Sequence, residues 1–253
     1  MDRHHDDGSA HAVNRPARKR CRRRRLINLF ALALLALLMG LYGCSGKQPP
    51  EKTETHPATP APTALFDGTI VAMGDSLTAG LGVPPEEAYP AQLERRLQAA
   101  GHHYRVINAG VSGETSSGAL SRVDWVIESL SPDIVILETG ANDGLRGTDP
   151  SLLEANLDEI VTRLQAHHVR VILAGMLMLP NLGPDYTRAF ARIYPSIAEK
   201  HDLIFIPFFL EGVAGKRRLN QPDQLHPTAQ GYTIVVDTLL PYVLDAIDRH
   251  RAG

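Results

Sequence analysis

From Phe66 onward, short apolar runs alternate with longer stretches of helical periodicity, and this alternation restricts the possible folds more than any other feature. The apolar runs are rich in β-branched residues and are mostly continuous, which is typical of strands that are buried on both faces of a sheet. These runs predict strands at Thr69–Met73, Tyr104–Asn108, Ile134–Thr139, Arg170–Met176 and Leu203–Phe208.

The longer stretches predict helices at Ala88–Ala100, Gly118–Leu130, Leu152–His168, Asp185–His201 and Pro227–Arg249. Strands that alternate with helices along a whole chain build βαβ units around a parallel sheet. The sequence therefore predicts the α/β fold class, with a single three-layer α/β/α domain and a parallel central sheet at residues 66–253. Open sheets of this kind bind ligands beyond the carboxyl ends of their strands.

The segment before this domain has the features of an export signal. Residues 1–25 are strongly basic, and residues 26–43 are apolar, uncharged and rich in Leu and Ala. This order of regions is typical of a secretory signal. The stretch Leu41–Ser45 resembles a bacterial lipobox, in which Cys44 would carry the lipid and become the mature N-terminus. We expect residues 1–44 to be a signal or lipoprotein segment, with an uncleaved anchor or conventional secretion as alternatives.

Residues 45–65 are rich in Pro and Thr and nearly free of large apolar residues, so they predict a disordered tether. Together with the signal, the tether predicts an exported protein that is held to a membrane and faces the periplasm or the cell exterior. The chain has two cysteines, Cys21 and Cys44, and both precede the domain. Neither a disulfide nor a cysteine-based metal site is therefore expected inside the domain.

The charge distribution argues against nucleic acid as a partner. The whole chain carries a net charge of −2, residues 1–25 carry +6, and residues 26–44 carry none, which leaves −8 on the remainder. Binding to nucleic-acid phosphates needs a clustered basic face, which an acidic body does not favour.

Two motifs together offer a nucleophile and its base. Gly74-Asp75-Ser76-Leu77 follows the first strand directly, where a serine can project from the sheet edge and Gly74 would permit a tight turn. Asp223-Gln224-Leu225-His226-Pro227 lies before the last helix. Histidine takes a proton from a weak serine nucleophile, and a carboxylate fixes the histidine tautomer. Taken alone, Ser76 could equally be a helix N-cap, and Asp223 and His226 could be ordinary loop residues.

Two further motifs follow the second and third strands. Asn108-Ala109-Gly110-Val111-Ser112-Gly113-Glu114-Thr115 contains glycines that would let a backbone N–H approach a substrate. Gly140-Ala141-Asn142-Asp143-Gly144 places an Asn amide where it can donate to a developing oxyanion. Each motif alone is also compatible with ordinary turn chemistry.

The four motifs together resemble the SGNH (GDSL) hydrolase superfamily, from about Thr69 to Tyr232. This resemblance implies an SGNH, flavodoxin-like hydrolase fold. It also implies that Ser76 is the nucleophile, His226 the base and Asp223 its orienting partner. The N–H groups of Ser76 and Gly113 and the Asn142 amide would form the oxyanion hole. No metal and no organic cofactor are implied.

A narrower resemblance is to the bacterial acyl-CoA thioesterase I, lysophospholipase and arylesterase group. It is carried by the stretches Ile107–Ser116, Glu138–Gly147 and Leu177–Glu211, in which the loop at Leu179-Pro180-Asn181 would cover an acyl site. Gln224 and Leu225 depart from the Gly and Ile that the group often has there. The resemblance implies a serine esterase or thioesterase that acts on aryl esters, acyl-CoA or lysophospholipids through an acyl-enzyme.

Other interpretations of the sequence remain beside this one. A carbohydrate O-acetylesterase would use the same residues, and a non-catalytic lipoprotein that binds lipid or cell-wall material would need a broken triad. The paired histidines at 102–103 and 167–168 do not suggest a metal site, because adjacent residues on such elements do not face one point. Trp125, Phe205, Phe208 and Phe209 are expected to pack in the core, with some of them possible lining for an acyl groove. The residues leave open the oligomeric state and the acyl-chain length.

Overall fold

The computed structural model describes residues 66–252 of the chain. The segments predicted at 1–44 and 45–65 lie outside these residues. Within the described part, no helix combines the length and hydropathy that crossing a lipid bilayer requires.

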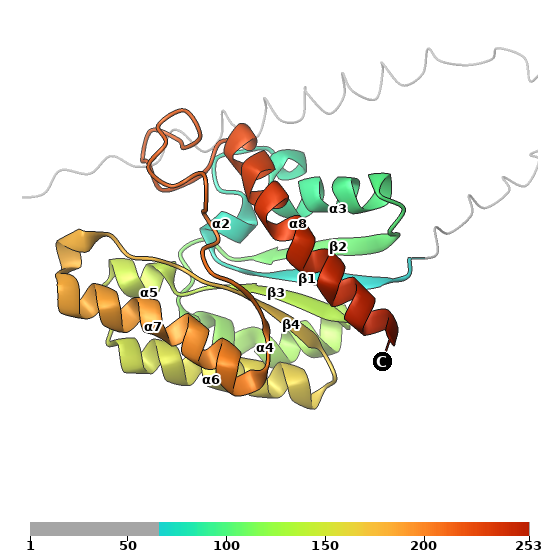
Figure 1. Cartoon of the computed structure of the whole chain (residues 1–253), viewed down its shortest axis with the longest axis horizontal. Coiled ribbons are helices and arrows are strands. Elements are labelled where there is room, and N and C mark those ends of the chain that lie inside the picture. The colour runs from blue at the N-terminus through green and yellow to red at the C-terminus, as the bar shows by residue number, and fades with distance from the viewer. Residues whose placement is uncertain (1–65, 253) are drawn as a thin grey trace, which may run out of the picture. The chain divides into compact units, whose positions relative to one another are not determined.

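A five-stranded parallel sheet forms the centre of the domain (Figure 1). Its strands run side by side in the order β2-β1-β3-β4-β5. The pairing aligns Gly74 with Gly110 on one side and with Glu138 on the other, so the carboxyl ends of β1, β2 and β3 meet at one edge. The strands are β1 (Gly68–Gly74), β2 (Tyr104–Gly110), β3 (Ile134–Glu138), β4 (Arg170–Ala174) and β5 (Ile204–Ile206).

Helices cover both faces of this sheet and make the three layers that the sequence predicts (Figure 1). Helices α3 (Tyr89–Ala99) and α8 (Ala229–Ala252) pack together on one face. On the other face lie α4 (Ser116–Leu130), α6 (Pro150–Ala166) and α7 (Pro184–His201). Four short helical segments connect these elements: α2 (Ser76–Ala79), η2 (Pro85–Glu87), α5 (Ala141–Leu145) and η3 (Pro180–Leu182).

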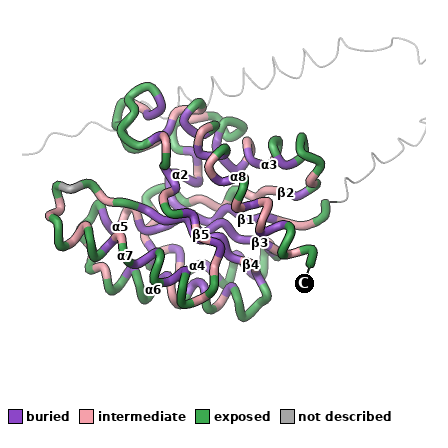
Figure 2. Tube along the Cα trace, viewed as in Figure 1, coloured by how far each residue is buried: buried purple, intermediate pink, exposed green. Residues whose placement is uncertain are grey.

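Burial explains why the central strands read as continuous apolar runs. Every residue of β3 is buried, as are the last five residues of β1 and the last four of β4, because helices press on both faces. Figure 2 shows this buried layer running through the middle of the domain, with exposed residues on the outer sides of the helices. Edge strand β2 is mostly half-buried or exposed.

The predicted strands and helices are all present, with small shifts at their ends. Helix α4 begins at Ser116 rather than Gly118, because Thr115 caps it through Oγ1, which accepts from the Gly118 N–H at 3.4 Å. The short helices α2 and α5 were not expected from the periodicity. The prediction that Trp125 packs in the core is wrong: its side chain is 55% exposed on the outer side of α4. Phe209, in contrast, is fully buried against Tyr89.

The order of the strands determines where a ligand can bind. From β1 the chain crosses to β2 on one side, and from β2 it returns past β1 to β3 and continues to β4 and β5 on the other side. The carboxyl ends of β1 and β3 therefore flank the point where the connections diverge, which is the usual binding crevice of such sheets. Ser76 follows β1 and Asn142 follows β3 at this point.

Candidate active site

Ser76 is the first residue of helix α2, directly beyond the end of β1. Asp75 caps this helix, since its Oδ1 accepts from the Leu77 N–H at 2.9 Å. Gly74 is needed for close approach rather than for an unusual φ, because a Cβ there would overlap the Thr78 hydroxyl and the Glu138 carbonyl oxygen. The strand and the cap together hold Ser76 at the sheet edge.

A continuous hydrogen-bond chain joins Ser76 to the segment before α8. Ser76 Oγ lies 2.9 Å from His226 Nε2, and His226 Nδ1 lies 2.7 Å from Asp223 Oδ2. The other carboxylate oxygen of Asp223 accepts from the backbone N–H groups of Leu225 and His226, at 2.9 and 3.1 Å. These bonds, the His226 side chain above all, lower the pKa of Asp223 to about 2 and keep the carboxylate ionised.

The loop between Asp223 and His226 turns through Gln224, which has a φ of 61°. This left-handed conformation favours glycine and is uncommon for other residues. The Gln224 side chain compensates in part by donating from Nε2 to the Gln221 carbonyl at 2.8 Å. Gln224 therefore occupies a backbone conformation that would suit glycine, the residue that the resembling group often has at this position.

The three expected oxyanion donors border the same cleft as Ser76 and His226. Gly113 adopts a φ of 80° in the turn after β2. Neither the Ser76 N–H nor the Gly113 N–H donates to an acceptor within residues 66–252. The Asn142 amide, in contrast, donates from Nδ2 both to Asp75 Oδ2 at 3.1 Å and to the Glu114 carbonyl at 2.9 Å. Asn142 can reach an oxyanion only by sharing one of these hydrogens.

Two carboxyl groups lie buried behind Ser76, and neither is assigned a role by the sequence motifs. Asp75 and Glu138 are both fully buried. Glu138 Oε2 accepts from the Thr78 hydroxyl at 2.8 Å and from the Asp75 N–H at 3.4 Å, so it contacts residues on either side of Ser76. Burial raises the pKa of Asp75 to about 6 and that of Glu138 well above its ordinary value. In the sequence, the one indication of this buried pair is Glu138 itself, a charged residue type at the end of the apolar strand β3.

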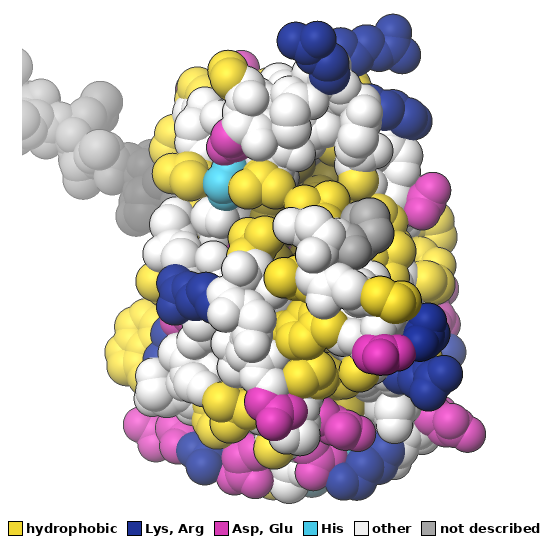
Figure 3. Space-filling model, turned by 90° about the vertical axis from the view of Figure 1, so that its left-hand side faces the viewer, with side chains coloured by type: hydrophobic (Ala, Val, Ile, Leu, Met, Phe, Trp, Pro, Cys, Tyr) yellow, Lys and Arg dark blue, Asp and Glu magenta, His cyan; other side chains and the backbone are white. Residues whose placement is uncertain are grey.

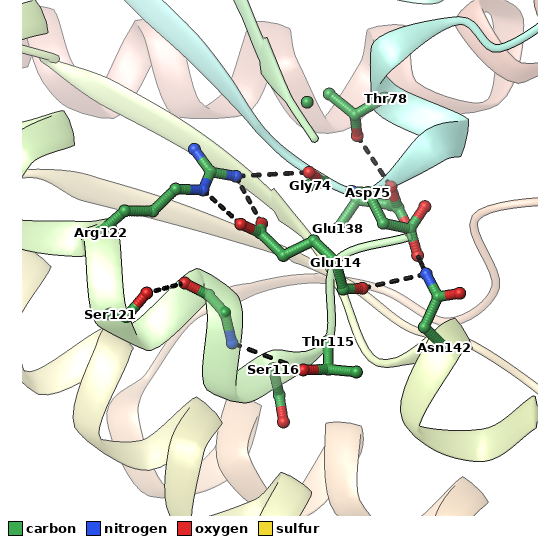
Figure 4. A network of polar contacts seen from close by, with 12 residues as sticks. Gly74, Asp75, Thr78, Glu114, Thr115, Ser116, Ser121, Arg122, Glu138 and Asn142 are labelled. Atoms are coloured by element: carbon green, nitrogen blue, oxygen red, sulfur yellow. Dashed lines mark hydrogen bonds and ion pairs between the residues drawn. The ribbon is translucent and has the colours of Figure 1, made fainter. Parts of the chain in front are cut away.

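An ion pair between Arg122 of α4 and Glu114, which precedes the helix, links the Gly113 turn to the end of β1 (Figure 4). Arg122 donates to both carboxylate oxygens of Glu114, at 2.7 and 2.6 Å, and to the Gly74 carbonyl at 3.3 Å. Figure 4 shows Asn142 between Asp75 and the Glu114 carbonyl, so this ion pair and the amide support the same turn. The pair thus joins the Gly113 turn to the residue two before Ser76, and the Asn142 amide joins its own loop to the same turn.

The cleft beside Ser76 has a volume of about 530 Å³, which is within the range of small-molecule sites. Apart from the catalytic candidates, its lining is mostly apolar, and it includes Phe208, which was expected in the core with a groove position as the alternative. The large apolar side chains that line it are Leu77, Leu81, Leu145, Met176, Leu177, Met178, Leu179, Phe208, Leu210 and Leu225. Within residues 66–252, no three His, Cys, Asp or Glu side chains gather as a metal ion would require.

Comparison with known proteins matches residues 72–234 to the GDSL-like Lipase/Acylhydrolase family. The chain is 38% identical over 173 residues to Esterase TesA of Pseudomonas aeruginosa, covering 68% of this chain and 86% of that protein. It is 34% identical to Thioesterase 1/protease 1/lysophospholipase L1 of Escherichia coli, covering 67% and 80%. The structure resembles a psychrotrophic esterase EstA from Pseudoalteromonas, solved inhibited by monoethylphosphonate, with a TM-score of 0.69, 35% identity and coverage of 72% and 100%.

Proposed function

The chain belongs to the GDSL-like lipase/acylhydrolase family, and from that membership we propose a serine esterase or thioesterase with Ser76 as its nucleophile. The observation that carries the proposal is the hydrogen-bond chain from Ser76 through His226 to Asp223, which opens on an apolar cleft. The family and its named relatives support ester hydrolysis as the reaction class. The roles of individual residues and the substrates are the proposal.

In the proposed reaction, Ser76 Oγ attacks the carbonyl carbon of an ester or thioester while His226 Nε2 takes the hydroxyl proton. The ionised Asp223 holds His226 in the tautomer that presents Nε2 as acceptor and stabilises the imidazolium that forms. Collapse of the tetrahedral intermediate releases an alcohol or thiol, which receives the proton from His226. Water, activated by the same histidine, then hydrolyses the acyl-enzyme.

The negative charge of the intermediate would be held by the N–H groups of Ser76 and Gly113. Both N–H groups border the cleft without an internal acceptor among the described residues, which suits donors that await a ligand. The Asn142 amide would add a third hydrogen bond by redirecting one N–H from Asp75 or from the Glu114 carbonyl.

The lining of the cleft favours substrates with an aryl or alkyl acyl group. Leu and Met side chains dominate it, whereas a sugar ring would need several polar partners. We therefore propose aryl esters, acyl-CoA thioesters or lysophospholipids as substrate classes. The experiment that tests this is hydrolysis of p-nitrophenyl esters from acetyl to dodecanoyl, with Ser76→Ala as control. We expect activity that the substitution abolishes and an optimum above acetyl. Activity confined to acetyl esters, with turnover of acetylated sugars, would favour the O-acetylesterase alternative.

We also propose that the enzyme is exported and held to a membrane through a lipid on Cys44. The support is in the sequence: a basic region, an apolar core at 26–43 and a following Gly43-Cys44-Ser45. Mass spectrometry of the mature protein tests this directly. We expect a diacylglyceryl-modified Cys44 at the N-terminus of the mature chain, and an unlipidated chain that does not begin at residue 44 from Cys44→Ser. A mature chain that begins elsewhere would rule out the lipoprotein.

A further inference from the structure

The exposed large apolar side chains of the domain are concentrated around the mouth of the cleft. Nine such residues are exposed among residues 66–252, and five of them line the cleft. These five, which we term the leucine rim, come from four separate segments and are Leu81, Leu145, Leu177, Leu179 and Leu225. Isolated exposed leucines need no explanation, but a contiguous patch marks an interaction surface. Figure 3 shows apolar side chains gathered on this face of the molecule, with polar groups between them.

A ligand in the cleft would not cover the leucine rim completely. Each of the five side chains borders the cleft, yet each is still between 41 and 54% exposed. Their inner sides can contact an acyl chain, while their outer sides face solvent around the opening. A broad apolar partner that lies across the opening would bury these outer sides.

A basic loop lies beside this rim. Lys216, Arg217 and Arg218 are consecutive and exposed, and they follow Gly215, which lines the cleft. None of the three forms an ion pair with an acidic side chain within residues 66–252. Glu211, five residues before Lys216, is the one acidic residue at positions 207–222 and is also exposed, so this stretch of the loop keeps a net positive charge. Because residues 45–253 carry a net charge of −8, three consecutive cations beside the cleft are a local exception.

From this arrangement we propose that the leucine rim and the basic loop dock the domain on the surface of a phospholipid bilayer that contains anionic lipids. Leucine side chains would enter the boundary between headgroups and acyl chains, and the three cations would contact anionic headgroups. A protein partner would need an apolar plate and an acidic border in the same arrangement, whereas a bilayer offers both over any area. The opening of the cleft would then face the depth at which lipid ester bonds lie.

The length of chain before the domain is compatible with this orientation. Strand β1 begins at Gly68, at the end of the sheet opposite to Ser76. Residues 45–65 can extend to at most about 70 Å, whereas a domain of this size is about 40 Å across. A lipid on Cys44, which is part of the proposed function, would thus let the domain turn its cleft toward the same membrane. The docking surface itself does not depend on that lipid or on catalysis.

Tryptophan fluorescence of the full chain in vesicles tests the docking. The chain has a single tryptophan, Trp125, which is exposed on α4 and does not line the cleft. The double variant Trp125→Phe/Leu179→Trp moves this reporter to the leucine rim. Both proteins are reconstituted into vesicles of phosphatidylcholine alone or with about a third of phosphatidylglycerol, in each case with brominated phosphatidylcholine as quencher. Circular dichroism verifies that the variant is folded.

We expect bromolipid to quench residue 179 and shift its emission to the blue, and to leave Trp125 of the unchanged chain unquenched. Each Lys or Arg near an anionic surface adds roughly fivefold to the affinity. The reporter variant with the three further substitutions Lys216→Gln, Arg217→Gln and Arg218→Gln should therefore show less quenching in anionic vesicles. Its quenching should also no longer depend on salt.

Absence of quenching at residue 179, or equal quenching of Trp125, would overturn the proposal. If quenching at residue 179 is the same with and without anionic lipid, and the same in the triple variant, the basic loop is not part of the docking surface. These readouts require no hydrolysis, so they stand apart from the proposed esterase activity.

Discussion

The side-chain amide of Asn142 donates a hydrogen bond to Asp75 Oδ2 at 3.1 Å, across 67 positions of the sequence. The residue proposed to stabilise the oxyanion is thus oriented by the residue next to the proposed nucleophile. Asp75 also caps the helix that Ser76 begins, through its other carboxylate oxygen. One buried carboxyl group therefore fixes both sides of the reaction centre.

Replacement of Asn142 by Ala should lower kcat for a p-nitrophenyl ester by roughly 10²–10³, the usual cost of losing one oxyanion donor. KM should change little, because the interaction strengthens only as charge develops. Steady-state kinetics at a fixed pH measure both constants, and the melting temperature shows whether the variant is folded. A kcat within a few-fold of the original would mean that Asn142 serves only to hold Asp75 and the Glu114 carbonyl.

The free energy of unfolding should depend on pH through the titration of Asp75. Burial raises its pKa from the ordinary value of 3.8 to about 6 in the folded protein. The folded state therefore holds this proton more tightly than the unfolded chain does. The resulting stabilisation is complete below about pH 4 and is lost as the pH rises through about 6, by at most about 3 kcal/mol.

Urea unfolding between pH 4 and 7 compares the original protein with Asp75→Asn. The asparagine cannot titrate, so the difference between the two free energies of unfolding should change across this range in the direction just given. Two parallel curves would show that Asp75 keeps an ordinary pKa in the folded protein.

Glu138 offers a contrast between two substitutions. Burial raises the pKa of Glu138 well above its ordinary value, because it disfavours the charged form of the carboxyl group. Glu138→Gln should then retain both the fold and most of the esterase activity. Glu138→Ala would leave the Thr78 hydroxyl and the Asp75 N–H without their acceptor and open a cavity, at a cost of about 2–4 kcal/mol. Equal losses for the two variants, measured by urea unfolding, would show that an ionised Glu138 is required.

The ion pair between Arg122 and Glu114 is suited to a double-mutant cycle. Both side chains are largely shielded from solvent, with 17 and 6% exposure. Arg122→Met should cost about 3–5 kcal/mol, because it leaves the Glu114 carboxylate buried without a counter-ion. Adding Glu114→Gln to Arg122→Met should recover a large part of that loss. If the double variant is as unstable as the sum of the single variants, the two side chains do not interact in solution.

Much of the fold could be predicted from the sequence because the relevant signals are local. The run Ile134–Thr139 is apolar since β3 is covered on both faces, and Gly101 marks the end of α3 where the chain turns with a φ of 84°. The order of the strands was not predictable in this way, because nothing in one strand identifies its neighbours. The prediction for Trp125 is wrong because an apolar side chain does not by itself indicate burial: many exposed residues are apolar.

In the candidate site, too, some residues could be predicted from local motifs and others depend on the pairing of distant strands. Ser76, His226 and Asp223 belong to short motifs that indicate a role only when they are taken together with the Gly113 and Asn142 motifs. Glu138, which contacts Asp75 and Thr78 from 63 and 60 positions away, acquires meaning only when β1 and β3 pair. The Asn142 amide was predicted as a donor, but its two present acceptors became visible only in the folded arrangement.

The most direct test of the central claim is to locate a covalent phosphonate adduct on the full-length protein by mass spectrometry. An activated ethylphosphonate ester imitates the tetrahedral intermediate and traps a serine that a neighbouring histidine activates. We predict one adduct, on Ser76, which forms in step with the loss of ester hydrolysis, forms slowly in His226→Ala and is absent in Ser76→Ala. An adduct on a different hydroxyl group, or full ester hydrolysis by Ser76→Ala, would contradict the assignment of Ser76 as the nucleophile.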